Sequence, residues 1–189
     1  LHSLFNFIAI GLGWAVAPRI AAVIFFAGVL LWWYCNRLKR KPFIGNVAVA
    51  FLTGLSIYLV GYYYQKNELF VFTYALFAFF LNLIRELLKD LEDRHGDQLH
   101  GSKTLPIVLG FRKTKQVIYS IAITFVGAIL TVSFQLNHTH LFYYFGGLGL
   151  VFCWFMWGIY RADRREQFTQ LSAFAKAIML VGTLSMAFL

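Results

Sequence analysis

Carboxylates gather in one segment of this chain, at a spacing that suits metal binding. Five of the eight Asp and Glu residues lie close together, and they are Glu86, Asp90, Glu92, Asp93 and Asp97. The series Glu86, Asp90, Asp93 and Asp97 has intervals of four, three and four residues, which fall on one face of a continuous helix. Aligned carboxylates repel one another, and Mg²⁺, which prefers oxygen ligands and is commonly shared with substrate phosphates, relieves that repulsion. The pattern therefore predicts a magnesium and phosphate site.

The loop that follows adds groups able to contact phosphate. We expect Gly96 to end the acidic helix, so that the side chain of Asp97 turns inward. Hydroxyl groups and a cation for phosphate oxygens come next, from Ser102, Lys103 and Thr104. Pro106 suits the first turn of a short helix that ends near Gly110. Charged helix ends beside membranes are also common as solvated interfacial segments, so the residue pattern by itself leaves that alternative open.

The composition places these residues beside a membrane. Hydrophobic residues make up 60% and charged residues 13% of the 189 residues, and the mean hydropathy is +0.67. A soluble domain has about 45–50% apolar and about 25% charged residues. Continuous apolar stretches, each near the length of about 20 residues that crosses a bilayer as a helix, occupy residues 1–17, 20–36, 44–64, 69–88, 116–136, 141–160 and 171–189. The sequence predicts an all-α, polytopic transmembrane helical bundle of about seven spans, in a single domain over residues 1–189.

The basic residues orient these spans. Fourteen of the seventeen Lys and Arg residues fall in or beside three loops on one side: Arg37, Lys39, Arg40 and Lys41; Arg85, Lys89, Arg94, Lys103, Arg112, Lys113 and Lys115; and Arg161, Arg164 and Arg165. Arg19 and Lys66 lie on the other side, and Lys176 lies within a span. The positive-inside rule makes the basic side cytoplasmic, so residues 89–115 form a cytoplasmic, aspartate-rich loop. Anionic membrane lipids and phosphorylated substrates are sufficient partners for this charge, and nucleic acid is not required.

Two motifs resemble a known family. The run Arg-Glu-Leu-Leu-Lys-Asp-Leu-Glu-Asp-x-x-Gly-Asp from Arg85 to Asp97, followed by Gly-x-x-Thr-Leu-Pro and Gly110, is similar to the second aspartate-rich motif of UbiA-type intramembrane prenyltransferases. Its form is most similar to the branch of geranylgeranylglyceryl-phosphate geranylgeranyltransferases. The loop from Tyr34 to Arg40, before Gly45 and Asn46, resembles the family's Tyr-Ser-x-x-Leu-Lys-Arg loop, with Cys35 in place of the serine. Cys35 therefore brings no hydroxyl contact.

The resemblance implies a longer protein. The family has nine transmembrane helices and an earlier Asn-x-x-x-Asp-x-x-x-Asp motif after its second helix. This chain resembles helices three to nine, over its whole length. We expect that it is N-terminally truncated and lacks the first two helices and the earlier motif.

The implied reaction is Mg²⁺-dependent transfer of a prenyl group from an isoprenoid diphosphate to a lipophilic acceptor. By resemblance, Asp93 and Asp97 bind Mg²⁺ and diphosphate, and Asp90 is a further ligand. Phosphate contact or charge balance is assigned to Arg85, Lys89 and Lys103, and polar support to Asn82. Lys39 and Arg40 either contact the acceptor's anionic group or anchor helix ends. We expect the enzyme in the plasma (inner) membrane, with its active site facing the cytoplasm.

Two further alternatives for function follow from the sequence. The motif favours a prenylglycerol phosphate as the acceptor, and an aromatic quinone or tocopherol-type precursor is the second candidate. A membrane transporter also places carboxylates at the mouth of a cavity, but it usually carries ionisable groups near the middle of the bilayer. Apart from Lys176, the apolar stretches carry almost no such group, which favours an enzyme that works at the cytoplasmic surface.

Overall fold

The computed structural model describes residues 2–64, 68–99, 101–136 and 139–185, and these residues form a bundle of helices with no strand among them. The long helices are α1 (His2–Val16), α2 (Pro18–Asn36), α3 (Ile44–Tyr63), α4 (Glu68–Glu92), α7 (Phe111–Leu136), α8 (Thr139–Arg161) and α9 (Arg165–Ser185). Short helical turns connect them: η1 (Leu38–Arg40), α5 (Arg94–Leu99) and α6 (Leu105–Val108). The long helices coincide with the seven expected apolar stretches, with starts that differ by up to six residues at α9, which confirms the all-α bundle.

Several helices have the length and composition of membrane spans. Four candidates occur among the described residues: Pro18–Asn36, Ile44–Tyr63, Glu68–Glu92 and Phe111–Val132. They contain 19 to 25 residues, which matches the roughly 30 Å of hydrocarbon that a helix must cross. Within α1, Leu4–Val16 is a shorter apolar helix. The fold is therefore that of an integral membrane protein.

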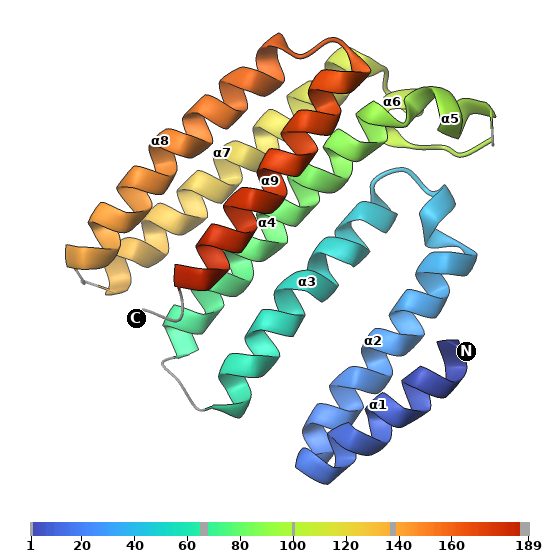
Figure 1. Ribbon diagram of the computed structural model, residues 1–189, viewed down its shortest axis with the longest axis vertical. Coiled ribbons are helices and arrows are strands. Elements are labelled where there is room, and N and C mark those ends of the chain that lie inside the picture. The colour runs from blue at the N-terminus through green and yellow to red at the C-terminus, as the bar shows by residue number, and fades with distance from the viewer. Residues whose placement is uncertain (1, 65–67, 100, 137–138, 186–189) are drawn as a thin grey trace.

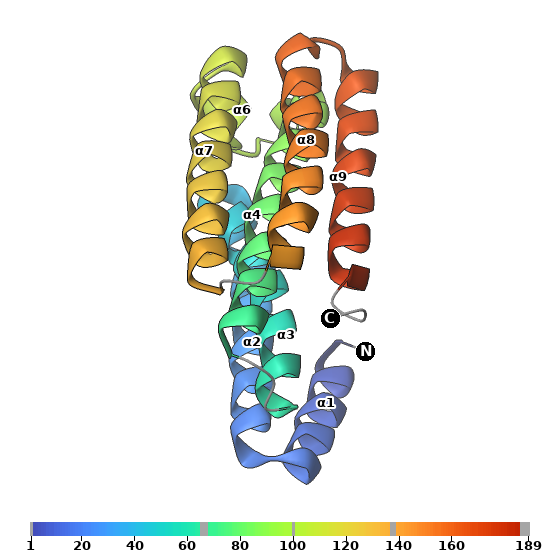
Figure 2. The same ribbon diagram turned by 90° about the vertical axis from the view of Figure 1, so that its left-hand side faces the viewer.

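Helix α4 lies at the centre of the bundle. It packs against α3 on one side and against α9 and α7 on the other (Figures 1 and 2). Leu81, Ile84, Leu87 and Leu88 are fully buried in α4, whereas most residues of the outer helices face outward. Two-thirds of the apolar window of α4 is buried, 67%, against 11% for α2. Because α4 carries acidic residues at its end, the most deeply buried of the candidate spans positions them.

The approach of α3 to α4 depends on glycine. A Cβ atom added at Gly54 would lie 2.9 Å from the carbonyl oxygen of Ala75 in α4 and 3.2 Å from the Cβ atom of Phe79. Neither contact involves a flexible chain end, so a larger residue here would push the helices apart. Close packing at Gly54 therefore sets the distance across which side chains at the ends of α3 and α4 meet.

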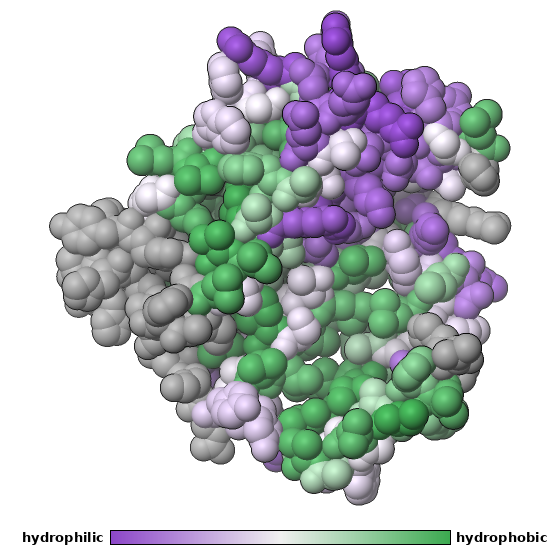
Figure 3. Space-filling model, viewed as in Figure 1, coloured by the Kyte–Doolittle hydropathy of each residue, from purple (hydrophilic) through white to green (hydrophobic). Residues whose placement is uncertain are grey.

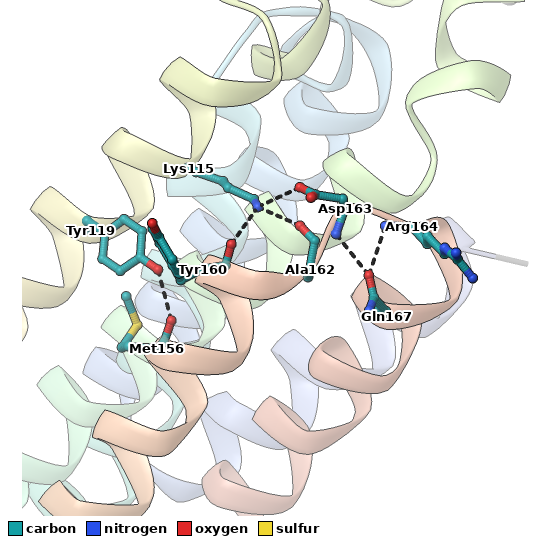
Figure 4. Close-up of polar contacts among 8 residues, drawn as sticks. All are labelled: Lys115, Tyr119, Met156, Tyr160, Ala162, Asp163, Arg164 and Gln167. Carbon is teal, nitrogen blue, oxygen red and sulfur yellow. Dashed lines mark hydrogen bonds and ion pairs between the residues drawn. The ribbon is translucent and has the colours of Figure 1, made fainter.

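The start of α9 is fixed by contacts with its neighbours (Figure 4). Lys115 of α7 donates hydrogen bonds to the carbonyl oxygens of Tyr160, at 3.2 Å, and of Ala162, where α8 ends. Its ammonium group also pairs with the carboxylate of Asp163 at 3.2 Å. A cation at a helix C-terminus satisfies free carbonyl groups and opposes the helix dipole. The side-chain oxygen of Gln167 then accepts hydrogen bonds from the backbone of Asp163 and Arg164, which caps α9.

One end of the bundle gathers the connections that carry charge. The η1 turn, the α5–α6 segment and the α8–α9 turn all lie at this end, which we call the polar end (Figure 1). Figure 3 shows hydrophilic side chains gathered there above a broad hydrophobic surface. The three basic loops expected from the sequence thus share one end of the molecule.

Candidate metal and phosphate site

Asp90 lies at the centre of the polar end. The side-chain amide of Asn46, in the first turn of α3, donates a hydrogen bond of 2.8 Å to Oδ2 of Asp90 in the last turn of α4. Both side chains are partly buried. The negative charges of Asp97, Glu86 and Asp93 act on Asp90 in that order of strength. The four spaced carboxylates therefore lie at one end of α4 within range of one another's charges, and no three of them are close enough in the described structure to bind a metal ion as they stand.

Asn46 reaches this position because the turn before α3 is tight. Phe43, the N-cap residue of α3, has a φ of 67°, a left-handed conformation that is strained for a bulky residue. A Cβ atom at Gly45 would lie 2.8 Å from the carbonyl oxygen of Leu38 and 3.2 Å from the ring of Tyr34. Only glycine allows this approach. The turn thus delivers Asn46 and Tyr34 to the acidic end of α4.

Sequence reasoning missed these two residues as members of the site. Tyr34 lies near enough for the charges of Glu86 and Asp90 to act on its phenol group. Tyr34 and Asn46 both belong to the second motif that resembles the prenyltransferase family, yet neither received a role. The pairing of Asn46 with Asp90 joins residues 44 positions apart, and the spacing of one motif does not reveal it. Their place in that motif was the available signal.

The acidic helix ends earlier than expected, and the expectation for Gly96 was wrong. Helix α4 ends at Glu92, and Gly96 and Asp97 lie inside α5. The backbone nevertheless continues with helical hydrogen bonds, from the N–H of Asp93 to the carbonyl of Lys89 and from the N–H of Asp97 to the carbonyl of Asp93, each 2.9 Å. Asp93 therefore sits at the junction between two helices, α4 and α5.

The glycine that terminates this helical segment is Gly101. Its φ is 67°, the left-handed conformation that a helix C-terminus requires. The N–H of Ser102 bonds to the carbonyl of Asp97 at 3.0 Å, and that of Gly101 to Gln98 at 3.3 Å, which is the Schellman pattern. Gly96 has no such conformation. The expected short helix with Pro106 in its first turn is confirmed as α6, and Gly110 follows it with a φ of 84°.

Helix α9 also contributes to the polar end. Nη2 of Arg165 lies 3.7 Å from Oδ1 of Asp93. Thr169, one turn later, donates a hydrogen bond of 2.8 Å to Oε1 of Glu92. Arg165 and Thr169 had no expected role at the site, because only the folded bundle brings the start of α9 beside the end of α4.

The expected phosphate-binding residues occupy different environments. Arg85 is partly buried and pairs with Glu86. The amide of Asn82 is buried and donates a hydrogen bond of 2.9 Å to Thr53 of α3, so it joins the two helices. The remaining cations, Lys39, Lys89 and Lys103, are exposed. The side chain of Arg40 lies outside the described residues.

The donor set fits Mg²⁺ shared with phosphate better than a metal cage made by protein alone. Among the described residues, no three His, Cys, Asp or Glu side chains are close enough to hold a metal ion as they stand. Mg²⁺, however, usually keeps several waters and takes one or two carboxylates together with substrate phosphates. The hydroxyl of Thr104 is buried without a hydrogen-bond partner among the described residues. Oxygen ligands around Asp90 and an unpartnered hydroxyl nearby in sequence suit a bound phosphate–metal group.

Comparisons with known proteins agree with the two motifs. The family model described as the UbiA prenyltransferase family matches residues 1–182. A protein named digeranylgeranylglyceryl phosphate synthase from Methanosphaera stadtmanae is 30% identical over 191 residues, which cover 95% of this chain and 66% of that protein. Proteins of the same name from Methanobrevibacter smithii and Thermococcus gammatolerans are 28% and 43% identical, over 87% and 61% of this chain.

The match covers only part of these relatives. The chain spans 59% of the Methanobrevibacter smithii protein and 42% of the Thermococcus gammatolerans protein. No solved structure matches the chain.

Proposed function

This chain belongs to the UbiA prenyltransferase family, and on that premise we propose that its protein transfers a prenyl group from an isoprenoid diphosphate to a prenylglycerol phosphate, with Mg²⁺. The observation that carries the proposal is the group of carboxylates around Asp90, held by Asn46 at the polar end of an apolar bundle. At this end, the diphosphate head of a lipid-soluble substrate would lie beside the carboxylates, and its prenyl chain would lie in the apolar bundle.

The name of the relatives favours a prenylglycerol phosphate as the acceptor. Their name specifies a product with two geranylgeranyl groups on glyceryl phosphate, so the acceptor of this protein would carry one prenyl group already. This name supports a glycerol phosphate over an aromatic quinone or tocopherol-type precursor. The basic residues of the polar end support a cytoplasmic position for the site, in the plasma (inner) membrane.

The reaction breaks the allylic C–O bond of the diphosphate and forms an ether C–O bond to the acceptor hydroxyl, which loses its proton. Negative charge grows on the leaving diphosphate while positive charge grows on the allylic carbon. Mg²⁺, when bound through Asp90, Asp93 and Asp97, would supply positive charge to the leaving group. Lys103 and Lys89 would add cationic contacts to the phosphate oxygens of the leaving group.

The residues of the chain also organise the site. Asn46 holds the carboxylate of Asp90 toward α3, and Asp93 lies at the junction between α4 and α5. The apolar walls of the bundle would exclude water from the allylic cation, and aromatic rings would stabilise it by cation–π attraction.

A transfer assay with the full-length protein tests the proposal. Membranes would receive radiolabelled geranylgeranyl diphosphate with either geranylgeranylglyceryl phosphate or an aromatic quinone precursor. We expect a labelled ether lipid from the glycerol phosphate in the presence of Mg²⁺, and its loss after chelation by EDTA. Product from the aromatic acceptor alone would assign the other substrate class, and no product from either acceptor would contradict prenyl transfer.

A further inference from the structure

A cavity between α4 and α9 combines two cations with an apolar wall. Its volume is about 400 Å³, within the range of about 300–1,000 Å³ that holds small ligands. The polar lining consists of Asn82 and Arg85 from α4 and of Lys176 and Thr183 from α9. Met179, Leu180 and Leu184 form the apolar part. The lining residues include no carboxylate.

The register of the two helices explains why Arg85 and Lys176 line the same cavity. Helices α4 and α9 run antiparallel, and the hydrogen bond between Thr169 and Glu92, 2.8 Å long, fixes their alignment. Seven residues further along each helix lie Lys176 and Arg85. Two helical turns correspond to about 10 Å, so both cations lie well below the α4–α5 junction at the polar end. They share the cavity because the sequence places each one two turns from the same contact.

Two cations that line one cavity favour an anionic ligand; Arg85 is partly buried and Lys176 is exposed. A charged side chain inside a membrane bundle is costly unless it is paired, and like charges that share a site repel. One terminal nitrogen of Arg85 pairs with Glu86, but its Nε atom is buried without a hydrogen-bond partner among the described residues. Lys176 makes no hydrogen bond or ion pair to any other described side chain. The cavity therefore presents an N–H donor and an ammonium group that an anion between them would satisfy.

We propose that this cavity binds the phosphate monoester of the lipid acceptor, between Arg85 and Lys176. The lipid chain lies along Met179, Leu180 and Leu184, away from the polar end. The same two helices meet again where Arg165 pairs with Asp93, eight residues or about 12 Å along α4 from Arg85, so an acceptor held by its phosphate extends its glycerol hydroxyl toward the proposed diphosphate site. This inference rests on the proposed prenyl transfer, and it assigns to Lys176 a substrate-binding role.

Binding and turnover test the inference separately, both with the full-length protein in neutral detergent. The probe for binding is dodecyl phosphate, with dodecanol as the uncharged control, and the readout is the shift in the midpoint of thermal unfolding. We expect Lys176→Met to weaken dodecyl phosphate binding about tenfold or more, because it removes a charge-assisted hydrogen bond. Lys176→Arg should retain binding. Lys113→Met, which removes an exposed cation from the polar end of α7, should bind dodecyl phosphate as the wild type does.

Turnover identifies the source of the bound phosphate. If the acceptor occupies the cavity, Lys176→Met raises KM for geranylgeranylglyceryl phosphate about tenfold and leaves KM for the prenyl diphosphate unchanged. Weakened dodecyl phosphate binding with an unchanged acceptor KM would overturn the assignment to the acceptor and leave a membrane phospholipid as the ligand. Unchanged dodecyl phosphate binding by Lys176→Met would overturn the site itself. If the wild-type protein transfers no prenyl group, the proposed function is wrong. The dodecyl phosphate binding measurement still tests the cavity in that case.

Discussion

Asn46 holds the carboxylate of Asp90 at the acidic end of α4. Its amide donates a 2.8 Å hydrogen bond to Asp90, and both side chains are partly buried. A hydrogen bond to a charged group contributes about 1.5–3 kcal/mol, and its loss leaves a carboxylate without a donor. We therefore expect Asn46→Ala to lower the free energy of unfolding by about 1–3 kcal/mol, measured by thermal unfolding of the full-length protein in detergent.

An exposed asparagine provides the control for this change. Asn36 donates a hydrogen bond of 2.8 Å to the carbonyl of Trp32 at the surface of α2, and it contacts no carboxylate. Asn36→Ala should change the unfolding free energy by less than about 0.5 kcal/mol. Equal losses for Asn36→Ala and Asn46→Ala would show that the bond to Asp90 adds no special stability.

Asp93 and Asp97 differ from Asp90 in their expected effect. Each is only partly buried, so Asp93→Asn and Asp97→Asn should leave membrane insertion and folding intact. If they hold Mg²⁺ and diphosphate, either change should lower kcat by about 100-fold or more, as the loss of one transition-state contact does. The measurement is prenyl transfer in detergent at saturating Mg²⁺. Glu166→Gln, an exposed carboxylate in the first turn of α9, is the matched control, and near-normal turnover in both aspartate variants would remove them from the metal site.

Residue spacing predicted part of this site and could not predict the rest. Intervals of three and four residues grouped the four acidic residues from Glu86 to Asp97, and in the structure the charges of the other three act on Asp90. The predicted helix end at Gly96 was wrong. A glycine ends a helix in this way where it adopts a left-handed conformation, and Gly101 rather than Gly96 does so. Asn46 and Arg165 come from distant parts of the chain, and only the packing of α3 and α9 against α4 brings them in.

At the scale of helices, the length of each apolar stretch was sufficient to locate it. A stretch of about 20 apolar residues leaves few alternatives to a spanning helix, and the structure has a helix at each expected place. The contacts between helices are less visible in sequence. That α4 is central and packs against α3, α7 and α9 follows from small residues and buried side chains on its faces, such as the contact of Gly54 with Ala75.

The close contact between Gly54 and Ala75 allows a prediction about the packing of α3 against α4. Alanine at Gly54 would place its Cβ atom 2.9 Å from the backbone oxygen of Ala75, so Gly54→Ala should destabilise the protein by about 1–3 kcal/mol. Gly127 in α7 has nothing within 4 Å of an added Cβ atom. Gly127→Ala should be neutral or stabilising by up to about 1 kcal/mol, since alanine favours a helix over glycine. Thermal unfolding in detergent compares the two variants, and a Gly54→Ala variant as stable as Gly127→Ala would show that α3 and α4 are not held at this distance.

The whole molecule separates charge from apolar surface along the axis of the bundle. The three charged connections meet at the polar end, and the hydrophobic surface below them matches the part of the chain that spans the membrane (Figure 3). This separation places a polar diphosphate head and an apolar prenyl chain in the environments that each requires. The fold brings the three basic loops to one end of the bundle. The positive-inside rule predicts that this end faces the cytoplasm.

Thiol labelling in cells tests that orientation. Cys35 and Cys153 are both exposed and would first be replaced by serine in the full-length protein. Arg94→Cys in α5 and Arg164→Cys before α9 would then report on the polar end, and Tyr64→Cys after α3 would report on the opposite end. Because fourteen of the seventeen basic residues lie in or beside the polar-end loops, we expect an impermeant thiol reagent to label Tyr64→Cys in intact cells and the two arginine variants only after the membrane is opened. Labelling of Arg94→Cys or Arg164→Cys in intact cells would place the carboxylates around Asp90 outside the cell, away from a cytoplasmic supply of prenyl diphosphate.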